Sequence, residues 1–195
     1  MKPLTKNEMR LVLLVLKSPE KQYNASSISR ELGISPMGAL KIASRLEKAR
    51  VLQSKLMGHA RYFEISFANE YARMLASFLL RHEAEHAVPY VQLWLNEARK
   101  IKSAELAVLF GSVLNKQKQA KDIDILLVVS QNNFNKLKKE IERVNLVNVK
   151  KLHPLFQSED DFKANVKKGD KILLSAIKGI AAFGEGKLVD LLASL

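Results

Sequence analysis

Apolar positions in the first third of the chain recur at the three- and four-residue spacing of short helices, and then alternate as in strands. Thr5 and Glu8 are spaced as a capping box at the start of the first helix. Ser35 and Pro36 supply an N-cap and a first-turn proline for the third helix. The pattern predicts helices over about 5–17, 24–32 and 36–50, followed by strands over 51–57 and 60–67.

Residues 68–103 carry a longer amphipathic pattern. It predicts a helix over 69–87, an interruption at Pro89, and a second helix to about residue 101. Two interpretations of this helix pair stay open: a linker packed against its own chain, or a seam between two copies of the protein.

The pattern changes again after residue 103, where short apolar runs alternate with polar-faced helices. We predict strands over 106–110, 122–130 and 146–156, with helices over 133–143, from 158, over 170–183 and over 187–195. The whole chain is therefore expected to be α+β. It is expected to comprise an N-terminal domain over 1–67, a helical linker over 68–103 and a C-terminal domain over 104–195.

Charge and composition narrow the class of partner. The 32 basic and 20 acidic side chains leave a net charge of +12, which favours a polyanionic partner such as nucleic acid or a nucleotide. The absence of cysteine excludes disulfides and thiolate metal sites. The longest apolar run near the start, Leu11 to Leu16, is too short for a signal peptide or a membrane span. We expect a cytoplasmic protein without a membrane partner.

The segment "LFGSVLNKQKQAKDIDILLVV", from Leu109 to Val129, holds the main candidate chemistry. Asp122 and Asp124 are two apart on a predicted strand, so their carboxylates project together and repel unless a cation lies between them. Mg²⁺ commonly joins one or two carboxylates to substrate phosphates. Gly111 permits a close backbone approach, and Ser112 offers a hydroxyl and an amide to a phosphate.

This segment resembles the signature of the nucleotidyltransferase superfamily related to DNA polymerase beta, in its minimal form. The hallmark residues of the signature are matched by Gly111, Ser112, Asp122 and Asp124. The resemblance implies that Gly111 and Ser112 bind the triphosphate of an NTP, with ATP the first candidate. It implies that Asp122 and Asp124 hold Mg²⁺ or Mn²⁺ as catalytic residues, and that a nucleotidyl group passes to a hydroxyl or phosphate acceptor.

The chain departs from that family at the third carboxylate, which full catalysis uses on a following strand. The third predicted strand, "NLVNVKKLHPLF", contains no acid, and its polar candidates are Asn148, Lys151 and His153. The acids at 159–161 lie beyond it. Nucleotide binding is therefore favoured over efficient transfer, and an enzyme and a nucleotide-sensing regulator without turnover stay open. A third reading makes Asp122 and Asp124 simple ion-pair partners of Lys116 or Lys121.

The N-terminal domain resembles a different family from the C-terminal one. "ASSISRELGISPMGALKIASRLEKARVLQSK" is similar to the core of winged helix-turn-helix transcription regulators, which implies DNA binding and, because such regulators read paired half-sites, a homodimer. The basic residues expected to contact phosphate are Lys41, Arg45, Lys48, Lys55 and Arg61. Related minimal nucleotidyltransferase domains act as antitoxins, which adds a cognate toxin to the candidate partners. A solvated basic helix face is the alternative reading.

A competing motif lies in the helical linker. His82, Glu83 and His86 match the H-E-x-x-H zinc pattern, with Glu105 as a candidate third ligand. Pro89 indicates that the helix ends directly after the motif, and histidine is favourable near a helix C-terminus for dipole reasons alone. We prefer the interpretation of a charged, solvated helix end.

Overall fold

The computed structural model describes residues 3–195. The chain forms two compact units, which divide between Leu79 and Leu80, and each unit is described by itself. Within the described residues, no helix is both long enough and apolar enough to span a bilayer.

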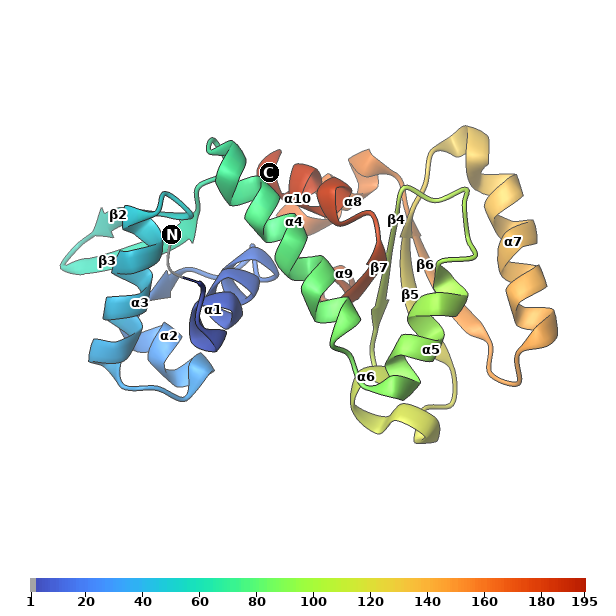
Figure 1. Ribbon diagram of the computed structural model, residues 1–195. Helices are drawn as coiled ribbons and strands as arrows, with labels where there is room; N and C mark the ends of the chain where they lie inside the picture. Colours follow the sequence, from blue (N-terminus) through green and yellow to red (C-terminus); the bar gives the residue numbers. More distant parts are fainter. Residues whose placement is uncertain (1–2) are drawn as a thin grey trace. The chain divides into compact units, whose positions relative to one another are not determined.

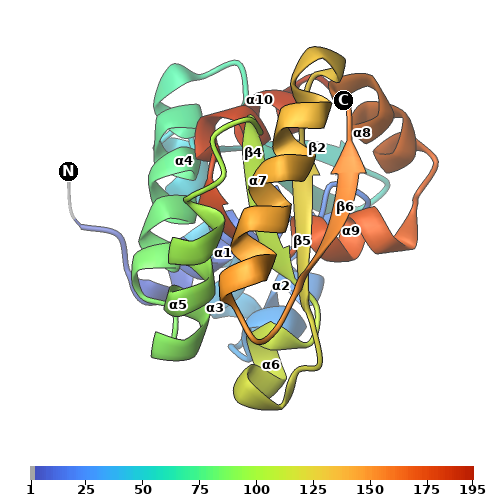
Figure 2. The same cartoon turned by 90° about the vertical axis from the view of Figure 1, so that its right-hand side faces the viewer.

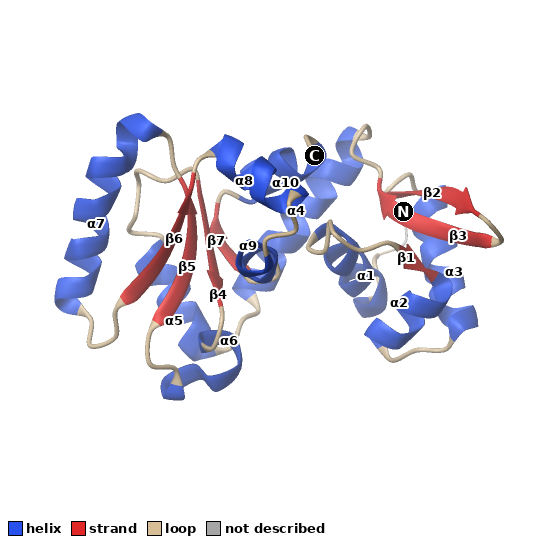
Figure 3. Ribbon diagram, turned by 180° about the vertical axis from the view of Figure 1, so that it is seen from behind, coloured by secondary structure: helices blue, strands red, loops and turns tan. Residues whose placement is uncertain are grey.

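The first unit is a winged helix-turn-helix (Figures 1 and 3). Its elements are α1 (Lys6–Leu16), β1 (Tyr23–Asn24), α2 (Ala25–Leu32), α3 (Pro36–Lys48), β2 (Leu52–Met57) and β3 (Ala60–Ile65). The strands form an antiparallel sheet in the order β1-β3-β2, and β2 and β3 are the wing. The core consists of apolar side chains from all three helices and the sheet, including Leu11, Ile28, Leu46 and Phe63.

Side-chain caps explain where these helices begin. The Thr5 hydroxyl accepts from the N–H of Glu8, and the Glu8 carboxylate accepts from the N–H of Thr5 at 2.8 Å, as the capping box predicts. The Ser35 hydroxyl accepts from the N–H of Gly38, with Pro36 in the first turn of α3.

The helical stretch between the two predicted domains is shared by the two units. Helix α4 (Glu70–Glu85) contains the division between the units, and α5 (Pro89–Ala98) belongs wholly to the second. The predicted interruption at Pro89 therefore separates two real helices, while the compact units divide inside the first of them.

The second unit is built on a four-stranded mixed sheet in the order β6-β5-β4-β7 (Figures 1 and 3). Its strands are β4 (Leu106–Phe110), β5 (Ile123–Val128), β6 (Leu152–Gln157) and β7 (Ile180–Phe183). Its helices after α5 are α6 (Val113–Lys116), α7 (Phe134–Val147), α8 (Glu159–Lys167), α9 (Lys171–Ile177) and α10 (Glu185–Ala193), with short 3₁₀ turns at 117–119 and 131–133. Strands β5 and β6 are parallel, and the other two pairs are antiparallel.

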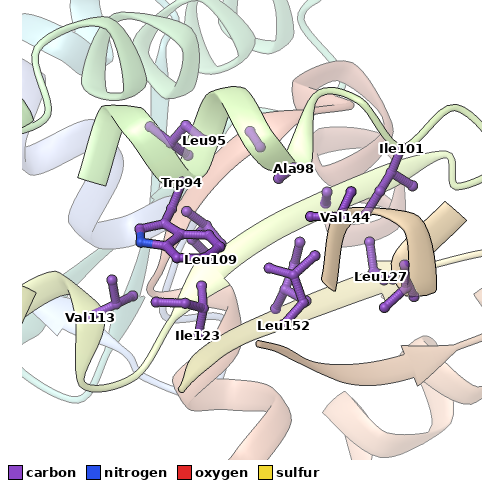
Figure 4. Packing of buried hydrophobic residues seen from close by; sticks show 14 of the residues in the cluster. Trp94, Leu95, Ala98, Ile101, Leu109, Val113, Ile123, Leu127, Val144 and Leu152 are labelled. Atoms are coloured by element: carbon purple, nitrogen blue, oxygen red, sulfur yellow. The ribbon is translucent and has the colours of Figure 1, made fainter. Parts of the chain in front are cut away.

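Helices cover both faces of this sheet. Alternation along β5 directs Ile123, Ile125 and Leu127 toward α5 and α7, where they join a buried cluster around Trp94 (Figure 4). Asp124, at the start of the strand, and Leu126 point to the opposite face, which α8, α9 and α10 cover (Figure 2). The burial of apolar side chains on both faces provides the main stabilisation of this unit.

Two predicted elements are wrong. Residues 146–149 are not part of a strand, because α7 continues to Val147; Leu146 and Val149 are 82% and 98% exposed, and the strand begins only at Leu152. The predicted helix over 170–183 ends at Ile177, and the next apolar run forms strand β7. A short apolar run has no distinguishing period, and pairing with the free side of β4 makes this one a strand.

Candidate functional site

Antiparallel pairing of β4 and β5 brings the two halves of the candidate motif together. Phe110 is the register partner of Asp124, so Gly111, which follows Phe110, lies beside the Asp124 carboxylate. Gly111 has φ +74°, and a Cβ built on it would lie 2.2 Å from Asp124 Oδ2. Glycine is therefore required here for both its backbone conformation and the space it leaves.

Ser112 follows at the start of α6, a helix of only four residues. Its carbonyl accepts from the N–H of Lys116 at 2.7 Å, while its side chain makes no capping hydrogen bond. Ser112 is half-buried. Its hydroxyl is thus held next to Gly111 without a role in capping the helix.

The two aspartates differ in their surroundings. Asp124 lies within β5 with its side chain 26% exposed, whereas Asp122 is exposed and precedes the strand, which begins at Ile123 and not at residue 122 as predicted. Among residues 3–195, neither aspartate forms an ion pair with Lys116 or Lys121, the partners expected if these acids were simple ion-pair residues. The carboxylate oxygens of both aspartates are therefore accessible from the surface and can accept a ligand.

The parallel strand β6 adds His153, which the sequence offered only as one of three polar candidates on the third predicted strand. His153 is the register partner of Asp124, and its Nδ1 lies 3.2 Å from Asp124 Oδ1. The His153 side chain is 74% exposed. An imidazole therefore lies beside Asp124 on the next strand, which is the strand on which the family resemblance implies a third carboxylate. Only the register of β5 and β6 brings it there.

The acids at 159–161 do not supply that carboxylate. They follow the far end of β6, where Val128 pairs with Gln157, whereas Asp124 pairs at the near end. Burial alone would lower the pKa of the Lys187 ammonium, but its bonds to Glu105 and Glu159 raise it above the usual value. Glu159 is thus committed to a salt-bridge network at the other end of the sheet.

The donor set fits a divalent ion that also binds substrate oxygens. Among the described residues, no group of three histidine or acidic side chains is placed to hold a metal ion. Asp122 and Asp124 offer carboxylate oxygens at one end of the sheet, and Mg²⁺ sites of this kind use one or two carboxylates and complete the shell with phosphate and water. The residues present therefore fit a metal ion whose coordination shell is completed by nucleotide oxygens and water.

In the first unit, three of the five predicted phosphate contacts have carboxylate partners within the chain. Arg45 Nη1 lies 3.1 Å from Oε1 of Glu8, which is 1% exposed. Arg61 donates to both oxygens of Glu47 and to Ser54, and Lys55 pairs with Glu64 at 2.9 Å. These three basic side chains are therefore partly neutralised by their own unit.

The other two predicted contacts are free of such partners. Lys41 and Lys48 are exposed and form no ion pair with any residue from 3 to 195. Together with Met37, which is 73% exposed, they lie on the solvent side of α3, opposite the buried Ala39 and Ala43. This stripe is the basic surface that α3 presents to solvent.

The H-E-x-x-H segment is a helix end. His82 and His86 stack with ring centroids 4.0 Å apart, and His86 Nδ1 lies 2.8 Å from the His82 carbonyl oxygen. Glu105, the candidate third zinc ligand, instead pairs with Lys187 at 2.7 Å. The motif therefore contributes two stacked rings at the end of α4.

Comparison with known proteins assigns the second unit. The family model described as "Polymerase beta, Nucleotidyltransferase" matches residues 95–178. The match contains both aspartates, the Gly-Ser pair and His153, and it covers less than half of the chain. No curated protein matches the sequence. The second unit thus has a nucleotidyltransferase fold.

Solved structures similar to this chain include two bacterial proteins. Lactococcus lactis ZitR, in a C30AH42A mutant, is 19% identical over 49% of this chain and 63% of its own, with a TM-score of 0.39. The adhesin competence repressor AdcR of Streptococcus pyogenes is 20% identical over 51% of this chain and 69% of its own, with a TM-score of 0.37. Another ZitR structure is a complex with DNA.

Proposed function

We propose that the second unit binds a nucleoside triphosphate together with a divalent metal ion and transfers its nucleotidyl group. The observation that carries the proposal is the contact of Gly111 with Asp124, where a Cβ would lie 2.2 Å from the carboxylate. A phosphate-binding turn and a metal-binding carboxylate are thereby next to each other, as transfer from a metal-bound triphosphate requires.

Each residue has a separate task in this proposal. Gly111 lets a phosphate approach the backbone, and the Ser112 hydroxyl donates to a phosphate oxygen. Asp122 and Asp124 would hold the ion, which would supply positive charge to the triphosphate and to the leaving pyrophosphate. The acceptor oxygen bonds to the α-phosphorus as the bond to pyrophosphate breaks, and the proton of a hydroxyl acceptor passes to water. ATP is the first NTP to test.

A second candidate, a nucleotide sensor without turnover, is favoured by a different observation. A histidine, His153, is the register partner of Asp124 on the next strand, and no acid lies on β6 to act as a third carboxylate. A protein of this kind would bind the nucleotide and regulate transcription through its first unit. An antitoxin-like role with a toxin partner, and a homodimer, are further proposals from the sequence.

DNA is the proposed partner of the first unit. The exposed stripe of Met37, Lys41 and Lys48 on α3 is the surface that such a helix inserts into the major groove. Lys55 and Arg61 on the wing are then candidates for flanking phosphates, after exchange of their intramolecular partners.

Labelled nucleotides separate the two candidates. The full chain would be incubated with α-labelled NTPs, Mg²⁺ or Mn²⁺ and candidate acceptors, and nucleotide binding would be measured in parallel. Label transfer that is lost in Asp124→Asn but kept in Asp160→Asn supports the enzyme. Nucleotide binding without transfer, again lost only in Asp124→Asn, supports the sensor. Wild-type protein that binds no nucleotide contradicts both.

A further inference from the structure

His153 is the side chain at the proposed site that differs most in chemistry from the carboxylates around it. We propose that His153 is a nitrogen ligand of the metal ion held by Asp124, and that it shifts the preference of the site from Mg²⁺ toward transition-metal ions such as Co²⁺. The inference rests on the proposed function, because it concerns the metal at that same site.

Backbone contacts hold His153 in place next to Asp124. Strands β5 and β6 pair over six residues, with the N–H of Ile123 donating to the carbonyl of Lys151 at 3.0 Å. Leu152 is buried, and its N–H donates to Asn145 Oδ1 at 2.7 Å. Because side chains alternate along a strand, His153 then points to the same face as Asp124. The start of β6 is therefore anchored while the ring itself stays exposed.

The observed distance suits two ligands of one ion. Metal–nitrogen and metal–oxygen bonds of about 2.1 Å at a right angle separate the two donor atoms by about 3.0 Å. His153 Nδ1 and Asp124 Oδ1 are 3.2 Å apart. The pair thus needs only a small adjustment to bind one metal through both atoms.

Ligand chemistry then determines which ion is preferred. Imidazole is a good ligand for zinc, cobalt, nickel and copper, whereas Mg²⁺ requires oxygen donors and gives up water reluctantly. A third carboxylate would favour Mg²⁺; an imidazole in its place favours a transition metal. The sequence contains no cysteine, so no thiolate competes with imidazole as the ligand for such ions.

The opposing interpretation makes the opposite prediction. If His153 were only a counter-charge for Asp124, it would compete with the metal, and its removal would tighten binding of every divalent ion. If His153 is a ligand, its removal weakens Co²⁺ binding selectively. The sign of the effect therefore distinguishes the two interpretations without any measurement of activity.

The test is metal binding by calorimetry and by the visible absorption of Co²⁺, using the full chain. The chain has four histidines. His82→Ala/His86→Ala would serve as the background, so that the stacked pair at the end of α4 does not add a second metal site. In this background we would compare His153→Ala, His153→Asp and, as control, His59→Ala on the wing.

We expect His153→Ala to lower Co²⁺ affinity about tenfold or more and to change Mg²⁺ affinity less than twofold. His153→Asp should raise Mg²⁺ affinity and lower the ratio of Co²⁺ to Mg²⁺ affinity, while His59→Ala changes neither. Tighter or unchanged Co²⁺ binding in His153→Ala overturns the inference. If ATP with Mg²⁺ still binds and is lost in Asp124→Asn, the proposed function survives that result; if wild type binds neither metal nor nucleotide, both fail.

Discussion

At the scale of single residues, the contact between Gly111 and Asp124 couples backbone conformation to the proposed ligand site. The glycine has φ +74°, and the carboxylate occupies the space where any other residue would place its Cβ. A substitution here therefore acts twice, through backbone strain and through displacement of Asp124.

Gly111→Ala should lower the free energy of unfolding by about 1–3 kcal/mol and abolish metal and nucleotide binding. Trp94, the only tryptophan, is buried in the second unit, so its fluorescence follows unfolding of that unit in denaturant. Gly169→Ala is the matched control, because Gly169 has φ +72° with nothing within 4 Å of the added Cβ. Equal losses of binding in both variants would contradict a specific displacement of Asp124.

At the scale of elements, an ion pair joins α1 to α3. Arg45 contacts the buried carboxylate of Glu8, whose other oxygen accepts from the N–H and hydroxyl of Thr5. The arginine predicted to contact DNA therefore also completes the cap of the first helix. Substitutions of Arg45 must be interpreted with this second role in mind.

Arg45→Ala should destabilise the first unit by about 1–2 kcal/mol, because it leaves Glu8 buried without its cation; the cost stays below that of a fully buried pair since Arg45 is 43% exposed. Lys41→Ala, on the exposed stripe, should cost less than about 0.5 kcal/mol. Thermal unfolding followed by far-ultraviolet circular dichroism measures both. Similar stabilities for the two variants would mean that the Arg45–Glu8 pair contributes nothing.

A second link between elements ties α7 to the segment before β4. Glu140 accepts from the N–H groups of Lys102 and Ser103 and from the Ser103 hydroxyl, each at 2.9 Å. Burial by itself would raise the pKa of the Glu140 carboxyl, but these three bonds lower it below its ordinary value of about 4.5. The ionised form is thus the one that stabilises the fold.

Because the folded pKa is the lower one, the stabilisation is fully present above the unfolded pKa and is lost as pH falls through the folded value. Glu140→Gln should therefore lower stability at pH 7 by about 1–2 kcal/mol. The difference in the free energy of unfolding between wild type and Glu140→Gln should decrease below about pH 4.5. Denaturant titrations of both proteins at several pH values measure this, and a deficit that stays constant down to pH 3 would contradict it.

At the scale of the whole molecule, the positive charge is concentrated in the first unit. Residues 1–79 contain 13 basic and six acidic side chains, so they hold +7 of the net +12. The measurable consequence of binding a polyanion with such a surface is the dependence of affinity on salt.

Lys41→Ala and Lys48→Ala should each weaken DNA binding and reduce the slope of log affinity against log salt by about 0.9, the release expected for one phosphate contact. Lys168→Ala, an exposed lysine after α8, is the control and should leave the slope unchanged. Fluorescence anisotropy of a labelled duplex over a range of salt concentrations measures the slope. An unchanged slope for both α3 variants would show that this stripe does not bind phosphate.

Features that depend on neighbouring residues could be predicted from the sequence. Thr5, Ser35 and Pro36 act within one helical turn, so the starts of α1 and α3 could be predicted from nearby residues. The Gly-Ser pair and the two aspartates are likewise a local motif, and their spacing pointed to the fold now assigned to the second unit.

Features that depend on contacts between residues distant in sequence were determined only by the tertiary structure. The pairing of β7 with β4 made a strand of an apolar run predicted as helix, and the register of β5 and β6 brought His153, 29 residues away, to Asp124. The burial of Glu8 gave Arg45 a partner that no local pattern indicates. Strand pairing and burial join residues whose separation along the chain carries no signal. The sequence therefore predicted the motif but could not choose His153 from the three polar candidates on the third predicted strand.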